Sequence, residues 1–275
     1  MNRSFIIAIS IVFFSTIVPS VSHSYFFYIP KDNEVLSRIG TGKQELLDSN
    51  QINLLVWNIY KGAKKNFIQD FNLLSQNKDI IIIQEAVLNN KLKDMFTSNK
   101  QHEHFFATAF IFSNEKIPTG LLTSASVNSQ SSQFLRSTYR EPIVSTPKMA
   151  LFTKYKLTNN EKLLLVINIH GINFVSYTAW RNQIINIINK IEVHNGPIIF
   201  AGDFNTWSTR RISFLTYSLK KLNFKNVKFK NDVRTTFFNI PLDHIFLRGL
   251  NYSNAKVWGG INSSDHKALT VTITN

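Results

Sequence analysis

The sequence contains no cysteine among its 275 residues. This absence excludes disulfide bonds, zinc sites built from thiolates and cysteine nucleophiles. Acidic residues are few, because 17 Asp and Glu stand against 31 Lys and Arg and leave a net charge of +14. Such a balance favours anionic partners, such as nucleic acid, phospholipid headgroups or an acidic protein surface. A lysine-rich background composition gives the same count, so the charge supports a phosphate-handling function without establishing one.

The sequence also lacks the run of about 20 apolar residues that spans a bilayer. Its longest apolar run covers residues 5–18, follows Arg3 and precedes a group of small residues. This order is typical of a secretory signal peptide, with cleavage after Ser22 or Ser24. We therefore expect a signal peptide at residues 1–24 and an exported protein, either periplasmic or secreted into the medium. An uncleaved N-terminal membrane anchor is the alternative.

Residues 25–50 are mixed and polar and are interpreted as a leader into a single domain at residues 51–275, which has no repeat, linker or composition break. Apolar periodicity predicts strands at 52–58, 79–86, 104–112, 120–127, 148–157, 163–174, 197–201, 242–250, 251–259 and 267–274. It predicts helices at 67–77, 87–98, 177–193 and 209–221, and the polar segment 128–133 is interpreted as a loop. This mixture favours two packed sheets with helices outside over one parallel sheet.

Acids, amides and histidines interrupt the apolar runs near the ends of the predicted strands. Each of them alone is explained by a turn or a helix cap. Together they indicate more, because a buried carboxylate needs a cation or a hydrogen-bond donor, and Mg²⁺ is bound by carboxylate oxygens and substrate phosphate. The set therefore predicts a metal-assisted phosphoester site. Its members are Asn58, Gln84, Glu85, Asn168, His170, Asp203, Asn205, Asp243, His244, Asp265 and His266.

The order of these motifs resembles the endonuclease/exonuclease/phosphatase superfamily over roughly residues 51 to 274, and within it the bacterial YafD-like group. The resemblance implies an α+β fold of the DNase I type, a four-layer αββα sandwich in which helices flank two mixed β-sheets. The motifs that carry it are "VWNI" (56–59), "IIQEA" (82–86), "NIH" (168–170), "GDFN" (202–205), "LDHIF" (242–246) and "SDH" (264–266).

The resemblance also implies a cofactor and residues that handle it. Glu85 would be the principal ligand of Mg²⁺, or of Mn²⁺, and Asn58 and Asp265 would assist it. Asp203 would position or deprotonate the attacking water. Asn205 would bind the phosphate.

Two histidines and an arginine complete the implied site. His266 would act on the phosphate or as a base, and Asp243 would orient its imidazole. His170 would contact the phosphate or protonate the leaving oxygen, and Arg140 would meet substrate phosphate. The family's acidic partner for the first histidine is missing, since Thr123 and its neighbour Ser124 occupy the comparable strand, so the partner of His170 stays open.

Three functions remain open at this stage. A nuclease acting on DNA or RNA is the leading interpretation, and a groove lined by Arg140, Arg210 and Arg211 would favour it. A sphingomyelinase-like or inositol-phosphate-type lipid phosphoesterase in contact with an anionic membrane surface is the alternative, and an exposed aromatic hairpin would favour it. A non-catalytic binding protein on the same scaffold is the third. No obligate protein partner is inferred, and His244 is interpreted as a neutral strand histidine or a further site residue.

Overall fold

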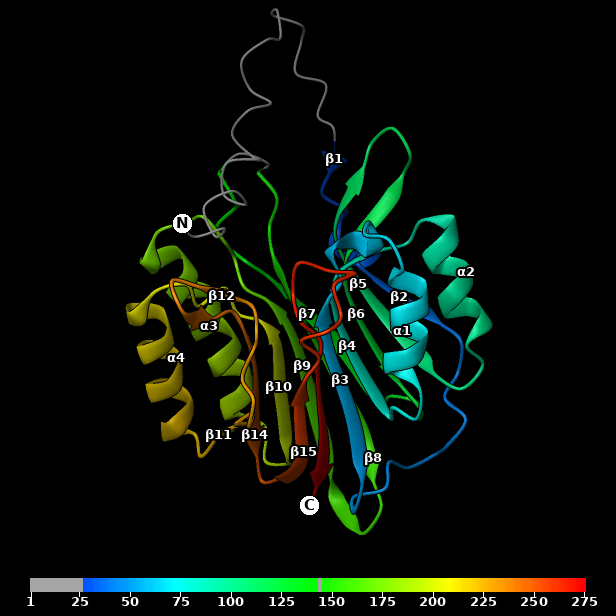
Figure 1. Cartoon of the computed structure of the whole chain (residues 1–275), viewed down its shortest axis with the longest axis vertical. Coiled ribbons are helices and arrows are strands. Elements are labelled where there is room, and N and C mark those ends of the chain that lie inside the picture. Colours follow the sequence, from blue (N-terminus) through cyan, green and yellow to red (C-terminus); the bar gives the residue numbers. More distant parts are fainter. Residues whose placement is uncertain (1–26, 143–144) are drawn as a thin grey trace, which may run out of the picture.

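The computed structural model describes residues 27–142 and 145–275, and the predicted signal peptide lies outside the described residues. Two β-sheets pack face to face in the middle of the molecule, and two pairs of helices cover their outer faces (Figure 1). The predicted α+β four-layer sandwich is confirmed. Among the described residues, no helix has both the length and the apolar character needed to cross a membrane.

The first sheet has the strand order β1-β5-β6-β4-β3-β16-β15, and β2 pairs separately with β5. Its two central strands, β3 and β4, are parallel and consist almost entirely of buried apolar residues. The strands are β1 (Phe27–Tyr28), β2 (Leu36–Ile39), β3 (Ile52–Asn58), β4 (Ile80–Val87), β5 (Glu103–Phe112), β6 (Ile117–Ala125), β15 (Asn251–Val257) and β16 (Leu269–Thr274).

The second sheet has the order β11-β14-β10-β9-β8-β7. Its strands are β7 (Ser131–Arg136), β8 (Met149–Leu157), β9 (Asn160–His170), β10 (Ile198–Asp203), β11 (Lys225–Asn226) and β14 (Asp243–Arg248). A separate two-stranded hairpin, formed by β12 (Thr236–Phe237) and β13 (Ile240–Pro241), directly precedes β14.

Four helices cover the outer faces of the two sheets: α1 (Phe67–Ser75), α2 (Asn90–Ser98), α3 (Tyr177–Glu192) and α4 (Thr209–Lys221). The first pair packs on the first sheet in a core that includes Phe71 and Leu92. The second pair packs on the second sheet, where Ile187 and Leu215 belong to one buried cluster. A third core, which includes Val56, Val166 and Ile199, lies between the sheets and holds them together.

Two sequence predictions differ from this structure. The leader is part of the first sheet, because β2 pairs with β5 in a register that joins Leu36 to Ala107. The predicted loop at 128–133 is wrong in part, since residues 131–136 form the edge strand β7 on β8. Both strands are short, lie at the edge of a sheet and expose part of their polar face, so neither shows the apolar pattern of a central strand.

Candidate active site

Three predicted site residues share one row across the second sheet. The parallel pairing of β9 with β10 places His170 beside Asp203, and the antiparallel pairing of β10 with β14 places Asp243 on the other side of Asp203. Gly202 makes this row possible, because its φ is +138° and a β-carbon there would collide with the carbonyl oxygen of Ile169. A larger residue at this position would push β10 away from β9.

The first sheet and a loop bring two more residues to the same edge. Asn58 ends β3 and donates through Nδ2 to Asp203 Oδ2 over 3.2 Å. His266 lies between β15 and β16, in a segment fixed from both sides. The carbonyl of His266 accepts from the indole of Trp57, and the hydroxyl of Ser264 donates to the carbonyl of Asn58. The site therefore forms only when the two sheets are packed together.

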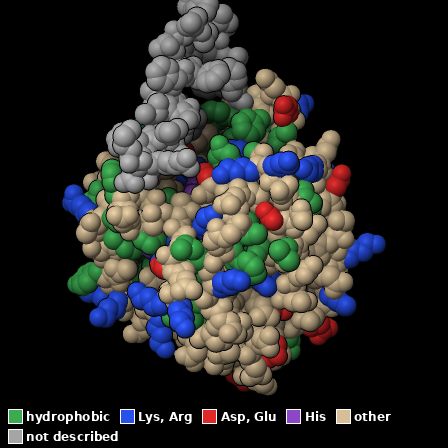
Figure 2. Space-filling model, viewed as in Figure 1, with side chains coloured by type: hydrophobic (Ala, Val, Ile, Leu, Met, Phe, Trp, Pro, Cys, Tyr) green, Lys and Arg blue, Asp and Glu red, His purple; other side chains and the backbone are tan. Residues whose placement is uncertain are grey.

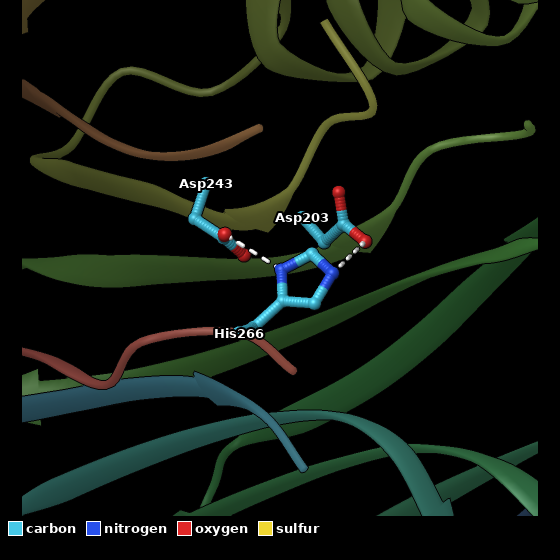
Figure 3. A group of neighbouring side chains, drawn as sticks. All are labelled: Asp203, Asp243 and His266. Atoms are coloured by element: carbon cyan, nitrogen blue, oxygen red, sulfur yellow. Dashed lines mark hydrogen bonds and ion pairs between the residues drawn. The ribbon is translucent and has the colours of Figure 1, made fainter. Parts of the chain in front are cut away.

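Asp203, Asp243 and His266 form a buried cluster (Figure 3). His266 Nδ1 lies 2.7 Å from Asp243 Oδ2, and its Nε2 lies 3.9 Å from Asp203 Oδ2. Burial opposes a charge on the ring, but the carboxylates of Asp243 and Asp203 together raise the pKa of His266 to about 10. His266 is therefore an imidazolium at neutral pH.

Asp203 lies at the centre of this hydrogen-bonding network. Burial raises its pKa to about 7, whereas the positive charge of His266 acts in the opposite direction. The backbone N–H of Asn205 donates to Asp203 Oδ1 over 2.9 Å, and the side-chain amide of Asn205 donates to the carbonyl of Gly171 over 2.8 Å. In this state Asn205 orients the carboxylate of Asp203, and its predicted contact with phosphate stays a prediction.

Glu85 reaches the site from a β-bulge. The pairing of β4 with β6 shifts register between Ile83 and Ala86, and Glu85 adopts a φ of 52° at this irregularity. A left-handed glutamate is uncommon and strained, which is typical of functional positions. Although burial opposes its charge, Lys61 helps to lower the pKa of Glu85 to about 2, and Lys61 Nζ lies 2.8 Å from Glu85 Oε2.

His170 lies between Asp203 and an apolar cavity of about 210 Å³. Its Nε2 is 3.5 Å from Asp203 Oδ2. Burial and the nearby ammonium of Lys148 hold the pKa of His170 well below its usual range, so the ring is neutral. A neutral imidazole is a weak proton donor, which disfavours protonation of the leaving oxygen, one of the two roles that the resemblance implies for His170.

Arg140, Arg210 and Arg211, whose shared groove would favour a nuclease, have different surroundings. Arg211 is 1% exposed and donates to the carbonyls of Val175 and Asn205, so it braces the loops beneath the site. Arg210 is exposed and stacks on the ring of Tyr177, 3.9 Å from its centroid. Arg210 and Arg211 therefore do not form the basic groove that would favour a nuclease. Arg140 is exposed next to Glu141, a lining residue of the cavity.

His244 is a structural residue of β14. Its Nε2 lies 2.8 Å from the hydroxyl of Thr206, and its Nδ1 lies 3.3 Å from a guanidinium nitrogen of Arg234. Burial and the charge of Arg234 lower the pKa of His244 to about 3, so it stays neutral. The interpretation as a neutral strand histidine agrees with these contacts.

Two lysines of the site were missed by sequence reasoning. Lys61 follows Asn58 by three residues and has a φ of 58°, which turns the chain back toward Glu85. Lys148 directly precedes β8, and its Nζ lies 3.4 Å from Glu141 Oε2. The lysine in "VWNIYKG" was a visible signal, because it follows a predicted site residue closely. Lys148 has no comparable signal, since only the fold brings it to the cavity.

The oxygen donors near Lys61 fit a hard divalent cation. Glu85 is ionised, and both Glu85 and Asp265 act electrostatically on the ammonium of Lys61. The two carboxylates therefore face one positive charge, and the amide oxygen of Asn58 accepts from the backbone N–H of Tyr60, next to Lys61 in the sequence. Asp203, Asp243 and His266 form a second group that could hold a metal, with ligand atoms within 4.8 Å of one another. In the metal-free protein His266 is protonated, so a metal bound to this second group would displace that proton.

Comparison with known proteins agrees with this geometry. Residues 55–266 match the model of the endonuclease/exonuclease/phosphatase family. A UPF0294 protein of Vibrio parahaemolyticus is 31% identical over 288 residues, which cover 100% of this chain and 99% of that protein. A UPF0294 protein of Photorhabdus laumondii is 36% identical over 84% of this chain and 86% of its own length.

Solved structures share the fold at low sequence identity. An endonuclease/exonuclease/phosphatase family protein from Leptotrichia buccalis superposes with a TM-score of 0.64 at 16% identity, covering 82% of this chain and 100% of its own. The catalytic domain of human Nocturnin, solved with a bound sulfate anion, gives 0.60 at 16% identity, covering 87% of this chain and 97% of its own. These likenesses show the fold and leave the substrate open.

Proposed function

Because this chain belongs to the endonuclease/exonuclease/phosphatase family, we propose that it is a divalent-metal-dependent phosphoester hydrolase that uses water as the nucleophile. The observation that carries the proposal is the buried cluster of Asp203, Asp243 and His266, which His170 connects to Glu85. The cluster joins the carboxylate of Asp203, whose pKa lies near neutrality, to the positively charged ring of His266. Phosphoester hydrolysis uses a base to activate water and a positive charge to stabilise the phosphate.

Asp203 is the proposed general base. A pKa of about 7 is close to ideal for a group that must accept a proton at neutral pH, and Asn58 and Asn205 hold its two oxygens in place. His266 is the proposed phosphate-binding cation rather than a second base, because its pKa of about 10 keeps it protonated. Asp243 fixes the orientation and charge of that ring.

The metal would be held by Glu85, Asp265 and the amide oxygen of Asn58. When bound, a divalent cation offsets the negative charge that develops on the phosphate as the P–O bond breaks. Lys61 occupies the neighbourhood of both carboxylates, so it must leave Glu85 before a cation binds there. Mg²⁺ is the expected ion and Mn²⁺ the substitute, since both accept oxygen ligands.

The substrate class is argued from the surface around this cluster. The net charge of +14 supports nucleic acid, but Arg211 is buried and Arg210 is held against Tyr177. The hairpin formed by β12 and β13 is exposed and aromatic, with Phe237 and Phe238 at its turn. This is the feature that distinguishes the lipid alternative, so a phospholipid phosphoester is the favoured substrate and nucleic acid is the second candidate. We further propose that the protein is exported, on the signal-peptide pattern of residues 1–24.

Parallel cleavage assays on the full chain test this proposal. Phosphatidylglycerol vesicles, sphingomyelin, plasmid DNA, RNA and inositol phosphates are offered with Mg²⁺, with Mn²⁺ and with EDTA. The proposal expects metal-dependent cleavage of at least one class and its loss in Asp203→Asn, an isosteric change that removes the base. Failure to cleave any class, or cleavage that survives both EDTA and Asp203→Asn, would contradict it. A biological activity left intact by Glu85→Ala would indicate the non-catalytic binding protein instead.

A further inference from the structure

Exposed aromatic side chains are concentrated around the active site. The part of the chain that the structure describes exposes seven Phe and Tyr side chains, and four of them are connected by contacts to residues of the site. Another, Tyr217, lies on the outer helix α4. We call the four the aromatic rim: Tyr60, Phe174, Phe237 and Phe238.

Contacts place the rim beside Asn58 and Asn205, the two residues that hold the proposed base Asp203. The backbone N–H of Tyr60 donates to the side chain of Asn58. Phe174 and Phe237 line a pocket of about 180 Å³ together with Asn205. The rings of Phe237 and Phe238 meet edge to face, 4.5 Å apart.

An apolar cavity lies next to these residues, and Phe27 lines it with Glu85 and His170. Tyr28 is the next residue of strand β1, so its exposed side chain faces away from this cavity and is not part of the rim. The four rim side chains come from loops and from the β12–β13 hairpin, at the edge of the sandwich that carries the site.

The backbone shows that stability does not explain these aromatics. Tyr60, Phe174 and Phe238 have φ values of 48°, 52° and 47°, a region that favours glycine and asparagine and is strained for bulky residues. Phe238 is also 82% exposed and Phe174 is 66% exposed, so neither ring gains burial in return. Strained and exposed aromatic residues beside an active site indicate a function for the side chains themselves.

Basic groups accompany the rim. Lys61 and Lys64 place their ammonium groups 5.5 Å and 5.7 Å from the centroid of the Tyr60 ring. Figure 2 shows basic side chains beside hydrophobic ones along the upper part of the described surface. Aromatic rings with adjacent Lys side chains match the interface of an anionic bilayer, where rings enter the headgroup region and cations meet lipid phosphate.

The N-terminal sequence leads to the same edge. The apolar run at residues 5–18 ends nine residues before Phe27, which is fixed on β5 against Phe112 beside the cavity. Nine residues reach at most about 30 Å. In the alternative in which the run is kept as a membrane anchor, this tether holds Phe27 and the neighbouring cavity within that distance of the bilayer.

We propose that the aromatic rim is a docking surface for an anionic phospholipid bilayer, which turns the mouth of the active site toward the headgroups. The docking stands on the rim alone. Its consequence, that the hydrolysed phosphoester is presented by the membrane, rests on the proposed function. The cavity suits this consequence, because Phe110 and Met149 form apolar walls while Glu85 and Lys148 supply charge at one end.

Site-specific labelling tests the docking, and the absence of cysteine makes every introduced cysteine unique. Phe238→Cys and Phe174→Cys are each labelled with an environment-sensitive nitrobenzoxadiazole dye in the full chain, beside Tyr217→Cys as the matched exposed control. Vesicles of phosphatidylglycerol and phosphatidylethanolamine are expected to brighten and blue-shift both rim labels and to leave the Tyr217→Cys label unchanged. The comparison holds whether or not the N-terminal run is also inserted, because it reports where each position lies.

Removal of the rings provides the second measurement. Phe237→Ser/Phe238→Ser is expected to weaken vesicle binding by on the order of ten-fold or more, because two phenyl rings no longer leave water. Tyr217→Ser is the control, and thermal unfolding checks that each variant is folded. Rim labels that ignore vesicles, or that respond to a single-stranded oligonucleotide instead, would overturn the proposal. The inactive Asp203→Asn protein still docks, so failure of docking and failure of catalysis are distinguishable.

Discussion

The strongest quantitative expectation concerns the charge of His266, and Asp243→Asn is the perturbation that isolates it. The substitution keeps the shape of the side chain and an oxygen that can accept from His266 Nδ1, but it removes the negative charge 2.7 Å away. At an effective dielectric constant of about 20, two unit charges about 4 Å apart interact by about 4 kcal/mol. Since about 1.4 kcal/mol corresponds to one pH unit, the pKa of His266 should fall from about 10 to about 7 in the variant.

NMR titration of the imidazole measures this change without a substrate. The Cε1–H resonance of His266, assigned with a His266→Gln variant, is followed from pH 5 to pH 11 in both proteins. In the wild-type protein the resonance should stay at its protonated position until about pH 10. A wild-type resonance that titrates near the ordinary histidine pKa, or an equal pKa in Asp243→Asn, would refute the reasoning.

The same groups predict a bell-shaped activity profile. Asp203 must be ionised to act as a base, so kcat/KM should rise as the pH increases through about 7. His266 must be charged to bind phosphate, so kcat/KM should fall as the pH increases through about 10. In Asp243→Asn the alkaline limb should move toward neutrality, because it reports the charge of His266. The acid limb should move as well, because the charges of Asp243 and His266 both act on the pKa of Asp203.

Three further expectations follow from individual contacts. Lys61→Met removes the ammonium that competes with a cation for Glu85, so calorimetry should find that Mn²⁺ binds several-fold more tightly. Weaker binding of Mn²⁺ by the variant would mean that Lys61 supports metal binding instead of competing with it. Burial lowers the pKa of His104 to about 4, so its contribution to stability is complete above pH 6.5 and is lost as the pH falls toward 4. Between pH 6.5 and pH 5 this loss is about 2 kcal/mol in urea unfolding, and His104→Gln should abolish it. Arg211→Met leaves buried carbonyls unpaired and should lower the free energy of unfolding by about 3 kcal/mol, whereas Arg210→Met should change it by less than about 0.5 kcal/mol.

The sequence predicted the parts of this molecule that follow from apolar patterning. The four isoleucines of β4 and the run that forms β9 lie in the core as expected, and the helix expected at 209–221 has those bounds. The site was also predictable in outline. Asp203 and His170 end neighbouring parallel strands, and such ends meet at one edge of a sheet.

What the sequence could not predict depends on tertiary contacts. The edge strands β2 and β7 have no apolar signature of their own and exist because a neighbouring strand offers hydrogen bonds. Arg211 was interpreted as a groove residue because the sequence shows that the residue is charged but does not show which way its side chain points. The bulge that turns Glu85 outward is a mismatch between β4 and β6, so neither strand reveals it alone.

The coupling between the two sheets gives the site its precision. Asn168 on β9 and Gln84 on β4 meet across the core, with Gln84 Nε2 donating to Asn168 Oδ1 over 2.7 Å. Asn168 in turn donates to the carbonyl of Ile83, at the start of the bulge that carries Glu85. One buried hydrogen-bond network therefore connects the strand that ends at His170 with the strand that presents Glu85. Because a buried amide is costly to leave unpaired, the two sheets are held in the one arrangement that brings Glu85 and the proposed base Asp203 to the same edge.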